Sequence, residues 1–214
     1  KNQSIDYDLT FIKPWRSEAK VRFTTTAKEG GTIVTWYMDS NFPWFMFWIK
    51  KLMLTFVGND CERGLNLLKD YVEDGKIHSK LSWKGESQYP GCNYLGIRRT
   101  CSITEMPIHL ETDFTKLMTY ARSTEGAQIS QAFTQYHKFD FVKKIVDYTA
   151  GIPFNNMPIG APSEFLRGSL APTKLYTLEH KGPYYHLGNA WSTLYTMQRR
   201  KEINTKQRYH PFET

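Results

Sequence analysis

Hydrophobic and polar residues alternate along the first forty positions, with the two-residue period of a β-strand. The apolar members of the first alternating segment are Ile5, Tyr7, Leu9 and Phe11. Val21 and Phe23 alternate with polar neighbours in a second segment, and residues 32–38 are rich in β-branched and aromatic side chains. Residues 28–31 read Lys-Glu-Gly-Gly, which is typical of a turn. This pattern predicts a meander of three antiparallel strands.

The pattern then changes to the three- and four-residue spacing of a helix. The apolar positions that share its face are Cys61, Leu65, Leu68 and Val72. Glycine follows the last of them in Asp74-Gly75-Lys76, where a helix commonly stops. We therefore expect the helix to end at Asp74 and a first domain to span residues 1–74.

Residues 41–54 form the most apolar stretch of the chain. Aromatic residues beside Lys50 and Lys51 would suit an interfacial helix on a membrane. Such a helix needs a polar opposite face, which this stretch lacks. We therefore expect a helix buried against the strand meander, although part of it would be exposed if the first domain is incomplete.

The second half of the chain contains a pattern that repeats. Strand, helix, strand and strand are predicted at 93–100, 111–123, 129–136 and 143–149. A strand at 174–179 and a helix at 184–199 begin the same order again, and Phe212-Glu213 would open the next strand. The predicted fold is α+β, with two such units joined in one antiparallel sheet and both helices on one face. The groove between the units would form a pocket.

Gly182-Pro183 marks the start of the second helix, because proline suits the first helical position. The residues that share a face after it are Tyr184, Leu187, Trp191, Leu194 and Tyr195. An aromatic stripe of this kind is typical of a core. The chain also has 13 Tyr and 6 Trp, and rings with polar groups suit a cavity that is apolar yet forms hydrogen bonds.

The segment from His180 to Trp191, with Phe212-Glu213 after it, resembles the GyrI-like effector-binding domain of bacterial multidrug-responsive transcription regulators. The resemblance covers roughly residues 81–214. It implies that Glu213 is a pocket glutamate that attracts cationic, lipophilic ligands. Its candidate walls are Tyr94, Tyr136, Tyr148, Tyr185 and Trp191. The alternatives are that Glu213 is a surface residue at a frayed end and that the rings are core.

The first domain has a weaker resemblance, to the second half of a START-like domain of the polyketide cyclase and dehydrase type (SRPBCC). It depends on the strand order, the Gly-Thr-Ile-Val-Thr-Trp strand at 31–36 and the Gly-Leu-Asn-Leu-Leu-Lys helix segment at 64–69. The domain would be partial, with a linker at 75–80. We also expect the GyrI-like domain to lack its last strand at Thr214. For the START-like half-domain, either the natural beginning is missing or another segment completes it.

The composition of the chain limits the classes of function that we expect for it. The chain has 214 residues, 40% of them hydrophobic and 23% charged, which is ordinary for a globular protein. Without a leader or a long apolar run, we expect a cytoplasmic protein with no membrane span. The net charge of +7 permits nucleic-acid contact, but no direct nucleic-acid-binding element is visible. A regulatory role would require a separate transcriptional partner or sequestration of the ligand.

No cofactor or metal is predicted. The cysteines, Cys61, Cys92 and Cys101, are three in number and have no Cys-x-x-Cys spacing. His180, His186 and His210 fit no metal-ligand pattern and are expected to face solvent or to be hydrogen-bonded structural residues.

Three functions remain open from the sequence. The first is a non-catalytic module that senses a small organic ligand, cationic or amphipathic. The second is a hydrolase of reactive small molecules, in which Glu213 activates water and Tyr136 or Tyr185 assists. The third is a lipid or polyketide-like carrier that uses the N-terminal domain.

Overall fold

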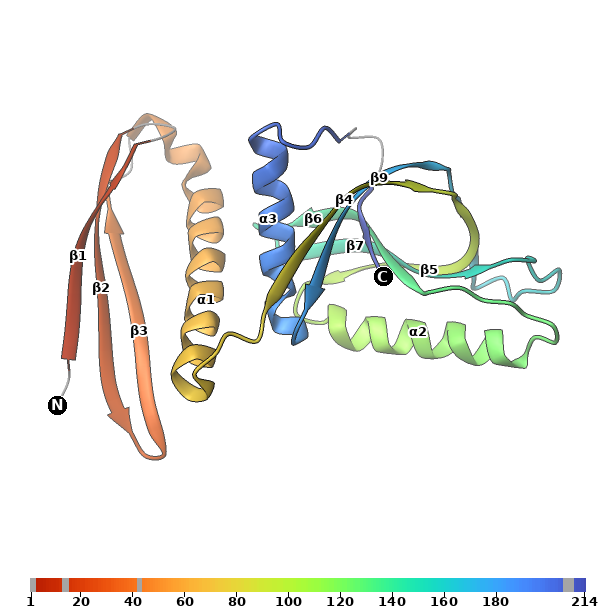
Figure 1. Ribbon diagram of the computed structural model, residues 1–214, viewed down its shortest axis with the longest axis horizontal. Helices are drawn as coiled ribbons and strands as arrows, with labels where there is room; N and C mark the ends of the chain where they lie inside the picture. The colour runs from red at the N-terminus through yellow and green to blue at the C-terminus, as the bar shows by residue number, and fades with distance from the viewer. Residues whose placement is uncertain (1–2, 13–15, 42–43, 206–209) are drawn as a thin grey trace. The chain divides into compact units, whose positions relative to one another are not determined.

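The structure is a computed structural model that describes residues 3–12, 16–41, 44–205 and 210–214 (Figure 1). The chain divides into two compact units. The first comprises Lys1–Lys80 and Lys181–Asn189, and the second comprises Leu81–His180 and Ala190–Thr214. The chain therefore enters the first unit twice, at positions far apart in the sequence.

The first unit contains the predicted meander of strands. Its antiparallel strands are β1 (Gln3–Phe11), β2 (Ser17–Lys28) and β3 (Gly31–Ser40), in that spatial order. Gly30 has a φ of 82° in the turn between β2 and β3, a conformation that glycine adopts without steric cost. The prediction of three strands and of this turn is confirmed.

A helical segment follows the meander. It consists of a 3-10 turn, η1 (Trp44–Ile49), and helix α1 (Lys50–Asp74). Gly75 ends α1 with a φ of 69°, and its N–H donates to the carbonyl of Tyr71 at 3.0 Å, so the predicted stop is confirmed. Gly64 lies so close to the ring of Trp36 on β3 that a Cβ there would come within 2.8 Å of it. The absence of a side chain at this position lets α1 approach the sheet.

The apolar stretch at 41–54 is helical from Trp44 onward, as predicted, but the prediction that it is buried is wrong. Phe47 is 74% exposed, Trp48 is 72% exposed and Leu54 is 63% exposed. The close approach of α1 to the meander occurs further along the helix, at Gly64, which leaves these side chains uncovered. Residues 42–43 of the stretch lie outside the described residues. None of the helices in the described ranges is long and apolar enough to cross a membrane.

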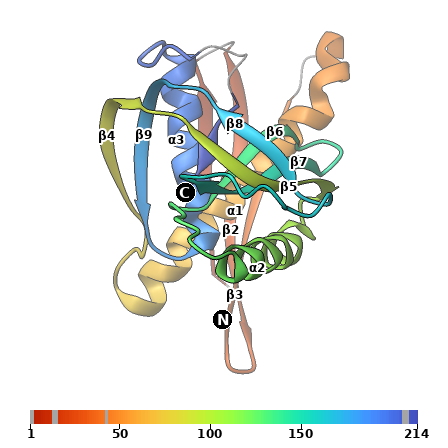
Figure 2. The same cartoon turned by 90° about the vertical axis from the view of Figure 1, so that its right-hand side faces the viewer.

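The second unit is built on an antiparallel sheet of five strands (Figure 2). In spatial order they are β10 (Phe212–Glu213), β6 (Phe133–Asp140), β7 (Ile145–Phe154), β5 (Cys92–Ser102) and β8 (Leu166–Leu170). Helix α2 (Met106–Ser123) packs against β5 and β7. Strands β4 (Lys80–Tyr89) and β9 (Thr173–Lys181) pair with each other in a separate sheet. A 3-10 turn, η2 (Tyr184–His186), leads into helix α3 (Leu187–Arg199).

The fold is α+β with antiparallel sheets, as predicted. The structure differs from the prediction of one joined sheet, because β9 pairs with β4 and not with the five strands. Helix α2 begins at Met106, five residues before its predicted start at Glu111, since Pro107 fits a first helical turn. Strands β4 and β8 were not predicted. The duplication of a strand-helix-strand-strand unit stays a prediction.

The core of the second unit lies between the sheet and α2. Strand β7 is central and buried on both faces from Tyr148 to Phe154. The sheet residues that face α2 and are fully buried are Leu95, Val146, Tyr148, Ala150 and Ile152. Leu117 and Ala121 of α2 complete this cluster. The core therefore fixes β7 and gives the edge strands a rigid support.

Candidate binding site

Glu213 lies on β10, the edge strand of the five-stranded sheet. It is opposite Thr134 of β6, while Phe212 is opposite Gln135. The carbonyl of Pro211 accepts a hydrogen bond from the N–H of Tyr136 at 3.0 Å. The strand therefore places the Glu213 carboxylate beside the side chains of β6.

Two aromatic side chains hold this carboxylate. The hydroxyl of Tyr136 donates to Glu213 Oε1 at 2.6 Å, and the indole N–H of Trp191 donates to Oε2 at 3.3 Å. The two rings meet edge to face, with centroids 5.5 Å apart. These two bonds orient the carboxylate along the face of the sheet that also carries Tyr136.

The aromatic surface continues on both sides of Tyr136 and Trp191. Phe139 packs against Tyr136 at 6.0 Å and against Phe141 at 4.6 Å between ring centroids. Tyr195 lies 6.2 Å from Trp191, one helical turn along α3, and burial raises its pKa. A half-buried carboxylate beside two rings, which are themselves in contact with further rings, is a site where a cation would gain from both the charge and the ring faces.

The other predicted wall residues lie elsewhere. Tyr148 is fully buried and donates its hydroxyl to Asp113 of α2 at 2.9 Å, although it is directly opposite Tyr136. Tyr94 faces the other side of the sheet, where it covers Gly168 and meets Phe133 edge to face at 5.0 Å. Burial is the main cause that raises the pKa of both tyrosines. Tyr185 belongs to the first unit.

A scan against models of known protein families gives no match, and neither does a search of curated proteins. Solved structures do resemble the chain. One is a crystal structure of the EcmrR C-terminal domain, with a TM-score of 0.45 and 20% identity, over 59% of this chain and 77% of that one. Another is a cryo-EM structure of an EcmrR–DNA complex, with a TM-score of 0.48 and 18% identity, over 76% of this chain and 60% of that one.

A shallow hollow of about 370 Å³ lies on the later turns of α3 and on the residues after it. Its lining consists of Ser192, Thr193, Thr196, Met197, Arg200 and Glu202. The hollow is open and its walls do not include Glu213, Tyr136 or Trp191, so the candidate site is defined by the carboxylate and its donors. Within the described ranges, no group of three or more His, Cys, Asp or Glu is arranged to hold a metal ion.

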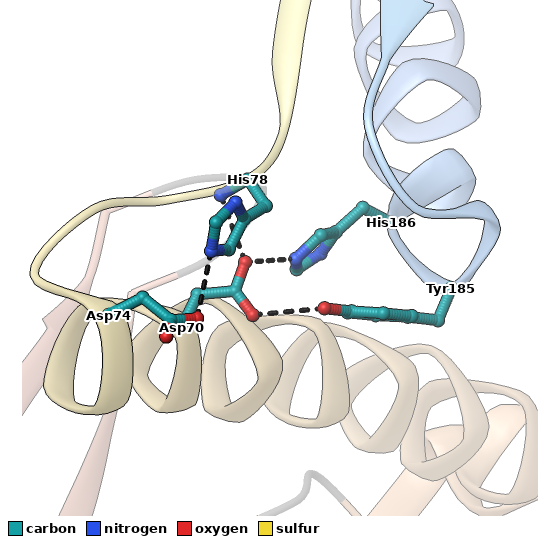
Figure 3. Close-up of polar contacts among 5 residues, drawn as sticks. All are labelled: Asp70, Asp74, His78, Tyr185 and His186. Atoms are coloured by element: carbon teal, nitrogen blue, oxygen red, sulfur yellow. Dashed lines mark hydrogen bonds and ion pairs between the residues drawn. The ribbon is translucent and has the colours of Figure 1, made fainter.

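The sequence analysis missed a buried polar cluster in the first unit (Figure 3). Asp70 of α1 accepts hydrogen bonds from His186 Nε2 at 2.6 Å, from the Tyr185 hydroxyl at 3.1 Å and from the backbone N–H of His78 at 3.0 Å. Asp74 lies 2.8 Å from His78 Nε2. Asp70 is 5% exposed and His186 is 1% exposed. The histidine is therefore a buried, hydrogen-bonded residue.

The electrostatics of this cluster favour the ionised aspartate. The N–H of His78 is the largest cause that lowers the pKa of Asp70; burial opposes it, and the bonds from His186 and Tyr185 support it. Burial and the bond to Asp70 raise the pKa of Tyr185. Gly182 makes the close packing possible, because it has a φ of 145° and a Cβ there would overlap the carbonyl oxygen of His78. The Gly-Pro step that starts the helix thus also serves this cluster.

Proposed function

We propose that the second unit is a GyrI-like module that binds a small organic molecule, cationic or amphipathic, at Glu213. The observation that carries this proposal is the Glu213 carboxylate held between the Tyr136 hydroxyl and the Trp191 indole. The two donors fix the direction of the carboxylate, and the neighbouring rings supply apolar area. The resemblance of residues 180–191 and 212–213 to the GyrI-like domain supports the same reading.

The role of such a module would be effector sensing. In the absence of a recognisable nucleic-acid element in the sequence, the bound state would be reported to a separate transcriptional partner or would serve to sequester the ligand. The Glu213 carboxylate makes cations the preferred class, because a neutral ligand would gain no Coulomb attraction from it.

A fluorescence titration tests this function. Benzyltrimethylammonium and its neutral carbon isostere, neopentylbenzene, have the same shape and differ in charge. We expect the cation to cause saturable quenching or a spectral shift of the tryptophan fluorescence. The affinity should fall by about tenfold or more in Glu213→Gln. Glu125→Gln is the matched control, because it removes the same charge from an exposed position after α2.

Two further variants locate the contribution of each donor. Tyr136→Phe and Trp191→Phe keep a ring and remove the donor, so each should weaken binding less than Glu213→Gln. Isothermal titration calorimetry measures these affinities, because Trp191→Phe removes the fluorescent side chain at the site. Equal affinity for the cation and the isostere, or equal affinity in Glu213→Gln and Glu125→Gln, would contradict the proposal.

The second candidate function is hydrolysis of a reactive small molecule. The distance of 2.6 Å between the Tyr136 hydroxyl and Glu213 favours it, because it gives a carboxylate and a proton donor in direct contact. Tyr185 does not share this contact, since it donates to Asp70. Turnover of an electrophilic ester or epoxide that is abolished by Glu213→Gln and retained by Glu125→Gln would establish this function.

A further inference from the structure

Strand β10, which carries Glu213, has a short attachment to the sheet. It has two residues and, within the part of the chain that the structure describes, pairs only with β6, at the edge of the five-stranded sheet. The ring of Phe212 adds contacts with Tyr89 at 5.4 Å and with Phe133 at 6.0 Å between centroids. Because so few backbone bonds hold it, a modest repulsive force next to β10 would displace it more easily than any longer strand.

Such a force would arise at His210, which directly precedes Pro211 and β10. Its ring lies edge to face with the ring of His137 on β6, with centroids 4.9 Å apart. His137 is tied to the sheet, because its Nε2 lies 2.7 Å from the hydroxyl of the fully buried Thr149. His210 is exposed. One ring of the pair is thus fixed to the sheet, and the other moves with the β10 backbone.

The charged groups around His137 come from four strands. Arg98 of β5 pairs with Asp147 of β7 through two hydrogen bonds of 3.0 and 2.7 Å, so their charges largely offset each other. Lys138 follows His137 on β6, and Glu213 ends β10 with its carboxylate at Tyr136. Burial, Arg98 and His210 lower the pKa of His137, in that order, and Asp147 opposes them.

We propose that His137 and His210 form a proton-sensitive contact, which keeps β10 on the sheet while the rings are neutral and loosens it when both are protonated. Two neutral imidazoles pack edge to face without penalty, whereas two imidazolium ions at this distance repel. The consequence at the binding site rests on the proposed function, because β10 positions Glu213. The response of β10 itself to pH does not depend on any ligand.

The direction in which stability changes with pH follows from the lowered pKa of His137. The folded protein binds fewer protons there than the unfolded chain, so stability is full above the ordinary imidazole value of about 6.5. Stability falls as the pH decreases below that value toward the folded-state pKa. Acidification therefore loosens the strand.

Hydrogen exchange on the full chain tests this contact. The amide of Tyr136, which donates to the carbonyl of Pro211, and the amide of Glu213 are compared at about pH 5 and about pH 8, after correction for intrinsic exchange rates. We expect protection of these amides to fall about five- to tenfold more at the acid pH than protection of β7. In His210→Gln this difference should disappear, since the segment that leads into β10 then carries no imidazolium for His137 to repel. His109→Gln, a histidine variant on α2, is the control and should keep it.

A binding measurement at the same two pH values separates this proposal from the proposed function. Benzyltrimethylammonium carries a fixed charge, so any change of affinity comes from the protein. If exchange responds to pH and His210→Gln removes the response, the contact is established even when the cation does not bind at either pH, a result that would overturn only the proposed function. Equal protection at both pH values, or a response that persists in His210→Gln, would overturn the contact.

Discussion

Each of the two units buries an aspartate of its helix beneath a tyrosine hydroxyl, but the basic partner differs. In the second unit, Asp113 of α2 accepts the Tyr148 hydroxyl at 2.9 Å and two hydrogen bonds from the Arg99 guanidinium. In the first unit, Asp70 of α1 accepts the Tyr185 hydroxyl and His186 Nε2. The same carboxylate geometry is therefore completed by arginine in one unit and by histidine in the other.

The identity of the basic partner determines how the negative charge of each aspartate is stabilised. Arginine is permanently protonated, and the hydrogen bonds that Arg99 donates to Asp113 raise the pKa of Arg99 further, so the positive charge of this pair is permanent. Asp70 instead has a backbone N–H as the largest contribution to its low pKa. Hence the Asp113 site joins helix to sheet through opposite charges, whereas the Asp70 site holds segment 181–189 on α1 through hydrogen bonds.

The largest loss of stability is expected when the ion pair between Arg99 and Asp113 is disrupted. Asp113→Asn leaves the Arg99 charge without its partner in a largely buried position, and should reduce the free energy of unfolding by about 3 kcal/mol. Urea unfolding of the full chain measures this loss. Glu111→Gln on the exposed face of α2 is the control and should stay within about 0.5 kcal/mol of the wild type. Equal losses for the two variants would show that the pair does not stabilise the unit.

Asp70→Asn should lower the free energy of unfolding less than Asp113→Asn, because an asparagine oxygen in the position of Oδ2 still accepts from the backbone N–H of His78 and from His186 Nε2. The characteristic effect of Asp70→Asn is on stability at acid pH. Since the pKa of Asp70 is lowered, its ionised form contributes stability above the ordinary value of about 4 and loses it as the pH falls through the folded-state pKa. Urea unfolding at pH values from about 2 to about 7 should show a shallower acid decline in Asp70→Asn than in Asp60→Asn, an exposed aspartate on α1. Parallel declines would rule out the contribution of Asp70.

The smallest effects compare the two hydroxyls. Tyr148→Phe removes a buried donor to Asp113 and should cost about 1 kcal/mol in the free energy of unfolding. Tyr185→Phe should cost measurably less, since Tyr185 is 56% exposed and water replaces the lost bond. Unfolding curves of the two variants under the same conditions measure the difference. A loss in Tyr185→Phe as large as in Tyr148→Phe would mean that the exposed hydroxyl contributes as much as the buried one.

Most of the helices and strands could be predicted from the sequence, because they depend on the local spacing of apolar residues. Strict alternation at Ile5 to Phe11 specified β1, and glycine at position 75 specified the end of α1. Strand β4 was missed since its sequence is largely polar and contains Gly85, at a φ of 78°. Strand β8 was missed because five residues with a central glycine give too short a pattern. Phe47 and Trp48 are exposed although their segment is apolar, because burial depends on what packs over a side chain, which no local period specifies.

The candidate site was predicted only in part for a related reason. Glu213, Tyr136 and Trp191 do meet, but the position of a ring depends on strand register as well as on residue type. Tyr94 faces the opposite side of the sheet from Tyr148, whereas Tyr136 shares the face of Tyr148. Asp70 and Asp113 gave no signal, because a single aspartate in a helix has the same pattern as a solvent-facing residue. Only the tertiary contacts reveal that both are buried.

The connectivity of the first unit has a consequence for synthesis of the chain. Asp70 and His186 are 116 positions apart in the sequence, with most of the second unit between them. During translation the meander and α1 emerge first, and Asp70 then lacks two of its three hydrogen-bond donors until residues 185 and 186 have left the ribosome. The first unit therefore begins to fold early and is completed late, so a nascent chain that stalls before position 185 would retain an unfinished unit for chaperones to recognise.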